Sequence, residues 1–175
     1  VHFTKSFHVK DPKALKSVVV TATADNDFKL SINGHPIVQG DDFKTLYTKH
    51  AMRALHAGEN VISVVANNHG DAPNPAGLIA AIQLTYTDGA TVQIGSDASW
   101  KASSDGQHWA AAKVLGDIGM GPWSLRARGN AKSKLYPPYE NTVALLEQDG
   151  QQHIFSSDGN LASSPHIEAD VSQAD

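Results

Sequence analysis

The fold is decided by one stretch of the sequence, Ala24-Asp25-Asn26-Asp27-Phe28-Lys29-Leu30-Ser31-Ile32-Asn33-Gly34. Apolar and polar side chains alternate from Phe28 to Ile32, which is the period of two of a β-strand with one buried face. Turn residues bound this strand on both sides. Asp25-Asn26-Asp27 tolerates turn geometry, and Asn33-Gly34 is a strong signal for a two-residue hairpin loop. The stretch therefore predicts one strand of an antiparallel sheet.

The same alternation continues on both sides of this strand. Val18 to Ala24 is expected to pair with it as a hairpin around Asp25–Asp27. Pro36 to Val38 is expected to return after Asn33-Gly34 as an edge strand, because proline cannot donate to a strand ladder. Asp88-Gly89 predicts a further hairpin with a primed turn. The other expected strands are Phe3–Val9, Phe43–Thr48, Asn60–Ala66, Leu78–Tyr86 and Thr91–Ile94.

Long helical patterns are absent from the sequence. The one helix-like stretch runs from Thr48 to His56, and because Gly58 follows it closely we interpret it as a single helical turn. At least seven short strands at regular intervals predict an all-β fold, an antiparallel β-sandwich of the jelly-roll type.

Composition narrows the classes of partner. The chain has 175 residues, of which 41% are hydrophobic, enough for a sizeable core. Its net charge of −4 and the lack of a basic run argue against nucleic acid. The longest apolar run, Leu78 to Ile82, is strand-sized, so we expect no membrane partner. Because the chain begins at Val1, we expect that a preceding segment was removed and that the protein is secreted.

Five short motifs follow one another within residues 1–128. They are Phe3–Phe7, Ala24–Gly34, Leu55–Ile62, Asp97–Lys101 and Gly119–Trp123. In this order they resemble the galactose-binding-like β-sandwich domains that accompany α-L-rhamnosidases, β-galactosidases and other secreted glycosidases. The resemblance implies a jelly-roll sandwich without catalytic residues, carbohydrate binding by loops at one end and, in some members, a structural calcium ion.

Two aspartates are candidate ligands of such a calcium ion. Asp25 and Asp27 lie in a turn-like cluster with Asn26, and carboxylate, amide and carbonyl oxygens are the donors that calcium prefers. An EF-hand spacing is absent, and the same residues also suit a plain turn. Calcium therefore stands beside the turn interpretation, and no other cofactor is expected.

Five residues are candidate contacts for a carbohydrate. Asp41, Asp42, Asn68 and His69 lie in polar loops and can hydrogen-bond to hydroxyls, although solvated loops have the same composition. Trp109 could stack on a sugar ring. Trp100 and Trp123 are expected in the core, because tryptophan is highly buried on average.

The sequence contains no motif for catalysis. Gly-x-Ser-x-Gly and His-Glu-x-x-His are absent, and the nine histidines lack the spacing of a zinc site. The aspartates lie in turn-like contexts that do not identify a glycosidase pair. We therefore predict that the chain is not an enzyme.

Composition changes after Arg128. Ala131–Lys134 and Tyr136–Tyr139 resemble a linker with polyproline character. Thr142–Leu146 and His153–Phe155 predict one more hairpin around Asp149-Gly150. Residues 156–175 are too polar to form a core of their own. We expect the 129–175 extension to dock on the sandwich or on a partner chain.

Two functions fit these patterns. The first is a secreted, lectin-like carbohydrate-binding protein. The second is a non-catalytic small subunit that stabilises a larger secreted enzyme, as in fungal heterodimeric laccases, with the extension wrapped around its partner.

Overall fold

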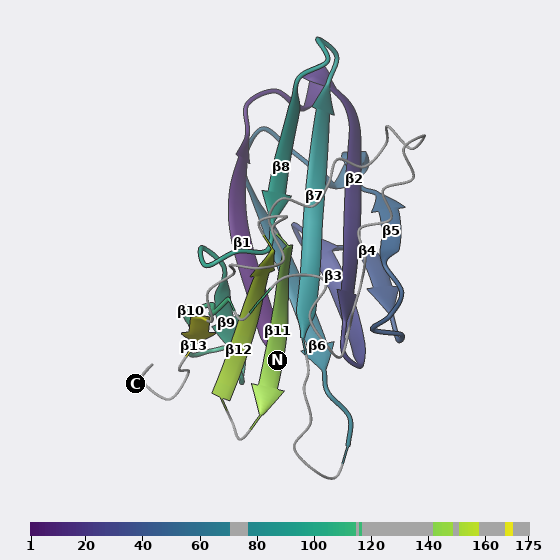
Figure 1. Cartoon of the computed structure of the whole chain (residues 1–175). Coiled ribbons are helices and arrows are strands. Elements are labelled where there is room, and N and C mark those ends of the chain that lie inside the picture. Colours follow the sequence, from purple (N-terminus) through teal and green to yellow (C-terminus); the bar gives the residue numbers. More distant parts are fainter. Residues whose placement is uncertain (71–76, 115, 117–141, 149–150, 158–166, 170–175) are drawn as a thin grey trace.

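The computed structural model describes residues 1–70, 77–114, 116, 142–148, 151–157 and 167–169, the last three segments as backbone. Figure 1 shows its strands stacked as two main antiparallel sheets and a smaller one. The six-stranded sheet, in spatial order, comprises β10 (Ala110–Ala111), β9 (Lys101–Ser103), β1 (His2–Val9), β6 (Gly58–Asn67), β3 (Asp27–Ile32) and β4 (His35–Gly40). The four-stranded sheet comprises β5 (Tyr47–His50), β2 (Leu15–Ala24), β7 (Leu78–Tyr86) and β8 (Thr91–Gly95). The smaller sheet comprises β11 (Thr142–Gln148), β12 (Gln151–Ser157) and β13 (Ile167–Ala169).

The core lies between the two main sheets and is built from alternate residues of their strands. Phe28, Leu30 and Ile32 of β3 are buried there, as the alternation predicts. Trp100 is 2% exposed and donates from Nε1 to the Gly95 carbonyl at 2.9 Å, so its expected place in the core is confirmed. Trp123 lies outside the described residues. The all-β antiparallel sandwich is confirmed.

Three of the expected local structures are confirmed next to β3 and β5. The β3–β4 hairpin turns at Asn33 (φ 52°) and Gly34 (φ 78°), and both positive φ angles are those of a type I′ turn. β4 forms one edge of its sheet, as Pro36 indicates. The helix-like stretch forms one 3-10 turn, Met52–Ala54, after β5. A second 3-10 turn, Pro12–Ala14, precedes β2.

The prediction that β2 and β3 form a hairpin is wrong. β2 pairs with β5 and β7, whereas β3 pairs with β4 and β6 in the other sheet. Asp25–Asp27 therefore crosses from one sheet to the other. Alternation and turn residues predict a reversal of the chain but do not specify which sheet the next strand joins.

Two other local expectations also need correction. The strand expected at Phe43–Thr48 is β5, Tyr47–His50, because Asp42 starts a turn in which its Oδ1 accepts from Lys44 N at 3.0 Å. The β7–β8 hairpin is confirmed, but its turn is not primed. Gly89 N donates to Tyr86 O at 3.1 Å and Gly89 alone has positive φ there, which is typical of a three-residue loop.

The expected hairpin in the extension is present as β11 and β12, whose register runs from Thr142 opposite Ser157 to Gln148 opposite Gln151. β11 lies against β7 of the sandwich (Figure 1). The domain boundary at residues 128 and 129 and the motif Gly119–Trp123 lie outside the described residues, so the boundary stays a prediction. Within the described part of the chain, no helix has the length and apolarity needed to cross a membrane.

Candidate ligand-binding end

One end of the sandwich gathers most of the residues that the sequence singles out. The strand register pairs Ala24 with Leu78, Asp27 with Asn67, and Phe28 with Gly40. The loops after β2, β4 and β6 therefore emerge at the same end. These loops, together with the first residue of β3, carry Asp25, Asp27, Asp41, Asp42, Asn68 and His69.

Asp25 is the most unusual residue at this end. Its backbone N–H donates to the Gly77 carbonyl at 2.8 Å, which fixes the crossing segment to the start of β7. The residue is only 6% exposed and its Oδ1 is buried, yet Oδ1 has no hydrogen-bond partner among the described residues. Burial raises the pKa of this carboxyl group, against the opposing charge of His69. A buried carboxylate oxygen without a donor is costly, so this position favours a cation or a hydroxyl donor.

Asp27 is instead fully engaged within the protein. Its Oδ1 accepts from Asn67 Nδ2 at 2.8 Å, and its Oδ2 lies 2.5 Å from His69 Nε2. Burial acts to raise the pKa of Asp27, but the hydrogen bonds from His69 and Asn67, with the charges of His69 and Lys29, lower it overall. Both oxygens are used, so Asp25 fits a calcium ion better than Asp27 does.

The loop after β6 is attached to the crossing segment at two further points. Asn26 N donates to the Asn67 carbonyl at 2.6 Å, and His69 N donates to Asn26 Oδ1 at 2.5 Å. Asn68 lies between these contacts and is half-buried. The structure thus brings Asn68 and His69 together with Asp25 and Asp27.

Asp41 and Asp42 lie at the same end but hold their own loop. Tyr47 Oη donates to Asp41 Oδ1 at 3.1 Å, and Asp42 Oδ2 accepts from Thr45 Oγ1 at 2.6 Å. The hydrogen bond from Thr45, then that from Lys44 N, lowers the pKa of Asp42. Gly40 permits this arrangement, because a Cβ there would lie 2.2 Å from the Tyr47 ring. Both aspartates are exposed, so their role as sugar contacts stays a prediction.

Trp109 lies away from this cluster. It precedes β10, the edge strand of the six-stranded sheet, and β9, β1 and β6 separate β10 from β3. The Trp109 side chain is half-buried. The structure therefore does not place Trp109 beside Asp25, and any stacking on a sugar would occur at a separate site.

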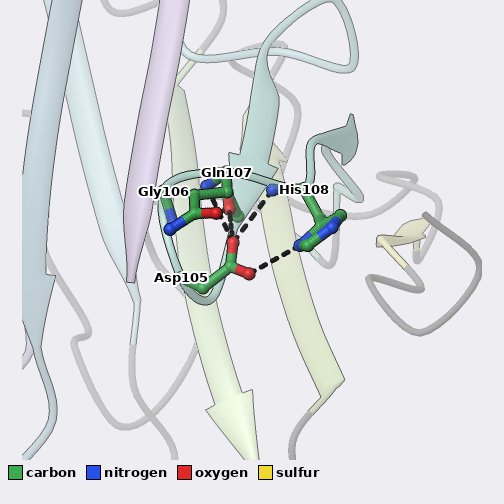
Figure 2. A network of polar contacts seen from close by, with 5 residues as sticks. Asp105, Gly106, Gln107 and His108 are labelled. Atoms are coloured by element: carbon green, nitrogen blue, oxygen red, sulfur yellow. Dashed lines mark hydrogen bonds and ion pairs between the residues drawn. The ribbon is translucent and has the colours of Figure 1, made fainter. Parts of the chain in front are cut away.

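A second polar network organises the loop before Trp109 (Figure 2). Asp105 Oδ1 accepts from the backbone N–H groups of Gln107 at 2.8 Å and His108 at 2.9 Å, and Oδ2 lies 2.6 Å from His108 Nδ1. Ser103 Oγ also donates to Oδ1 at 2.9 Å. The donors, first the His108 backbone and then its side chain, hold the pKa of Asp105 well below its usual range. These bonds close the β9–β10 loop.

Sequence reasoning missed the roles of Asn26 and Asn67. Both amides connect the crossing segment to the loop after β6, and neither was a candidate contact. The pairing of Asp27 with Asn67 across 40 positions depends on strand register, which no local motif reveals. Within the described residues, no group of three or more His, Asp and Glu is arranged to hold a metal. A cation at Asp25 would therefore need amide and carbonyl oxygens as well.

Comparison with known proteins finds similarity to an α-L-rhamnosidase and to a fungal lectin at 28–31% identity. No family model matches the chain. The α-L-rhamnosidase of Streptomyces avermitilis is 28% identical over 130 residues, which cover 64% of this chain and 12% of the enzyme. Its structure with L-rhamnose has a TM-score of 0.60 at 28% identity and covers 70% of this chain and 13% of that one. The Pleurotus ostreatus lectin in complex with GalNAc has a TM-score of 0.57 at 31% identity and covers 70% of this chain and 38% of the lectin.

The α-L-rhamnosidase of Aspergillus terreus, at 19% identity, supports the fold alone, with a TM-score of 0.51 over 87% of this chain and 23% of that one. This chain spans only a small part of either rhamnosidase and well under half of the lectin. The resemblance to galactose-binding-like β-sandwich domains is therefore confirmed at the level of the fold, which this chain shares with part of several α-L-rhamnosidases and with a fungal lectin.

Proposed function

We propose that this chain is a secreted, non-catalytic carbohydrate-binding protein whose ligand site lies around Asp25 at the end of the sandwich. The single observation that carries the site is the buried Oδ1 of Asp25, which has no hydrogen-bond donor among the described residues. Binding of a cation or a hydroxyl there would remove the cost of leaving it unpaired. Asn26, Asn67, Asn68 and His69 supply polar groups around it.

Similar proteins support a sugar as the ligand. The Pleurotus lectin was solved with GalNAc and the Streptomyces rhamnosidase with L-rhamnose. The chain carries no motif of a nucleophile or a metallohydrolase, which supports a binding role. The rhamnosidases and the lectin reported above do not bear on the alternative of an accessory subunit, which stays a prediction.

We propose calcium as the cation that Asp25 Oδ1 would bind, together with amide and carbonyl oxygens of the neighbouring loops. Asp25 offers an unengaged carboxylate oxygen, and calcium accepts carboxylate, amide and carbonyl oxygens in irregular sets. When bound, calcium would neutralise the carboxylate and add a positive centre for sugar hydroxyls. The protein's own part is to hold Asp25 in place through the bond from its N–H to Gly77.

The test is isothermal titration of the full chain with L-rhamnose and with GalNAc, in calcium and in a chelator. We expect one of the two sugars to bind in calcium, and Asp25→Asn to weaken that binding by about tenfold to a hundredfold, as loss of a charge-assisted contact of about 1.5–3 kcal/mol requires. Asp88→Asn is the matched control, because Asp88 lies in the β7–β8 turn, away from Asp25, and accepts from Ala90 N at 2.8 Å. Equal sugar affinity in Asp25→Asn and in the unmodified chain would refute this site.

A further inference from the structure

The outer face of the four-stranded sheet contains a buried patch that the core does not explain. Strands β2 and β7 direct Val20, Ala22, Ala80 and Ile82 into the core. The residues between them point to the opposite face of the sheet, where solvent exposure is expected. Four of these are nevertheless buried, namely Thr21 (4% exposed), Thr23 (0%), Ile79 (3%) and Ala81 (5%).

These four residues form one contiguous surface, the outer patch. Thr21 is opposite Ala81 and Thr23 is opposite Ile79 in the register of β2 and β7. The next pair along the same face, Val19 and Gln83, is only half-buried. Burial is thus confined to the half of β7 that begins at Leu78, and it requires a cover that is limited to that half.

The extension supplies a backbone in the right place. β11 lies against β7, and Figure 1 shows it in front of the half of β7 that carries the outer patch. Its sequence, Thr-Val-Ala-Leu-Leu-Glu-Gln, is rich in apolar residues. Apolar strands need such a partner, because burial of apolar area is the main source of their stability.

The polar groups of the outer patch are already satisfied without help from the cover. Thr21 Oγ1 lies 3.0 Å from Thr48 Oγ1, and Thr23 Oγ1 donates to the Asp42 carbonyl at 3.3 Å. An apolar strand can therefore cover the patch without leaving these hydroxyls unpaired. The patch also adjoins the candidate site, because Asp25 follows β2 and bonds to Gly77 at the start of β7.

We propose that β11 is a permanent third layer of the sandwich, seated on the outer patch, and that it holds in place the strand ends that carry Asp25. β11 is then part of the binding module and not a free arm for a partner. The effect of β11 on ligand binding rests on the proposed function, whereas the seating of β11 on β7 does not.

Thiol labelling of the full chain tests the seating directly, because the sequence contains no cysteine. The three single variants are Ala81→Cys in the outer patch, Gln83→Cys on the same face beyond it, and Ala80→Cys in the core. We expect a maleimide to label position 81 at least about tenfold more slowly than position 83, and position 80 more slowly still. Equal rates at positions 81 and 83 would overturn the proposal.

A second variant identifies the cover. Leu145→Pro removes a backbone donor from β11 and breaks its pairing with β12. Combined with Ala81→Cys, it is expected to raise labelling at position 81 to the rate at position 83, while position 80 stays protected and shows that the core is intact. An unchanged slow rate at position 81 would assign the cover to another segment and refute the role of β11.

Two further outcomes distinguish this proposal from alternative explanations. Protection at position 81 that depends on protein concentration would assign the covering strand to a second copy and overturn seating within one chain. Ile79→Cys serves as a second reporter of the outer patch if Ala81→Cys does not fold.

All labelling is done without sugar or calcium, so the labelling result does not depend on whether the proposed function is correct. A sugar affinity unchanged by Leu145→Pro would contradict the support of the Asp25 end by β11.

Discussion

The two ends of strand β3 lie beside similar polar residues, which differ in how completely they are hydrogen-bonded. At its start, Asp27 pairs with Asn67 and His69, and the adjacent Asp25 keeps a buried oxygen without a donor among the described residues. Beyond its other end, Asn33 meets Asn60 in a network in which each amide is satisfied. One end contains a buried carboxyl oxygen without a partner in the described part of the chain, and the other end contains a completed set of hydrogen bonds.

The completed end centres on Asn60, which is 0% exposed. Its Oδ1 accepts from Asn33 Nδ2 at 2.8 Å and from His56 N at 3.0 Å. Its Nδ2 donates to the carbonyls of His56 at 2.8 Å and Gly58 at 3.0 Å. Four bonds from one buried side chain connect the segment after the 3-10 turn, the start of β6 and the β3–β4 hairpin, and Asn33 Nδ2 also donates to the Ala54 carbonyl of the turn at 2.8 Å. This pattern is typical of a structural network.

The contrast teaches how to separate structural from functional polar residues in this fold. Asn33-Gly34 and Asp25-Asn26-Asp27 are both turn signals in the sequence, and composition alone does not rank them. The completeness of their hydrogen bonds in the structure does distinguish the two stretches. A residue whose atoms all have partners stabilises the fold, whereas a buried carboxylate lacking a donor is costly until a ligand arrives.

The largest expected effect comes from breaking the completed end. Asn60→Ala leaves two donors and two acceptors without their amide partner, so we expect the free energy of unfolding to fall by about 3–4 kcal/mol. The free energy of unfolding is measured by urea denaturation, with tryptophan fluorescence as the signal. Glu59→Ala, an exposed neighbour on β6, is the control and should change stability by less than about 0.5 kcal/mol. A loss below about 1 kcal/mol for Asn60→Ala would contradict the structural role.

A smaller effect of opposite sign is expected at the other end. In the presence of a chelator, Asp25→Asn should raise the free energy of unfolding by about 1 kcal/mol, because it replaces a buried charge with a neutral side chain of similar shape. Added calcium should stabilise the unmodified chain and leave the variant unchanged. If Asp25→Asn in chelator is destabilised as much as Asn60→Ala, the Asp25 side chain stabilises the fold as the Asn60 network does, and the contrast between the two ends is wrong.

Most strands of the two main sheets were predictable from sequence, whereas the short strands β9 and β10 and the bounds of β5 were not. The candidate site was predictable only in part. Alternation from Phe28 to Ile32 and the Asn33-Gly34 turn predict β3 and its hairpin correctly, because both signals are local. The crossing at Asp25 was not predictable, since turn residues do not specify the next strand's sheet. The burial of Asp25 depends on that crossing. The pairing of Asp27 with His69 depends on register between strands that are far apart in sequence.

The smallest expected effect tests a third kind of polar residue, one that is exposed yet fully bonded. The pKa of Asp105 is lower in the folded chain than its usual value of 3.8, so its ionised form is favoured by folding. The stability that it adds is present above pH 3.8 and is lost as the pH falls through the lower folded pKa. The unmodified chain should therefore exceed Asp105→Asn in stability at neutral pH, and the difference should narrow as the pH falls below 3.8.

Carbon NMR of the Asp105 carboxyl group measures the cause of that difference. We expect a titration midpoint clearly below 3.8 in the folded chain. His108→Ala removes the imidazole contact at 2.6 Å but keeps the backbone donor at 2.9 Å, so the midpoint should move only part of the way back. A midpoint at or above 3.8 in the unmodified chain would show that exposure outweighs the hydrogen bonds of the β9–β10 loop. Satisfaction of hydrogen bonds would then separate structural from functional carboxylates only where they are buried, as Asp25 is.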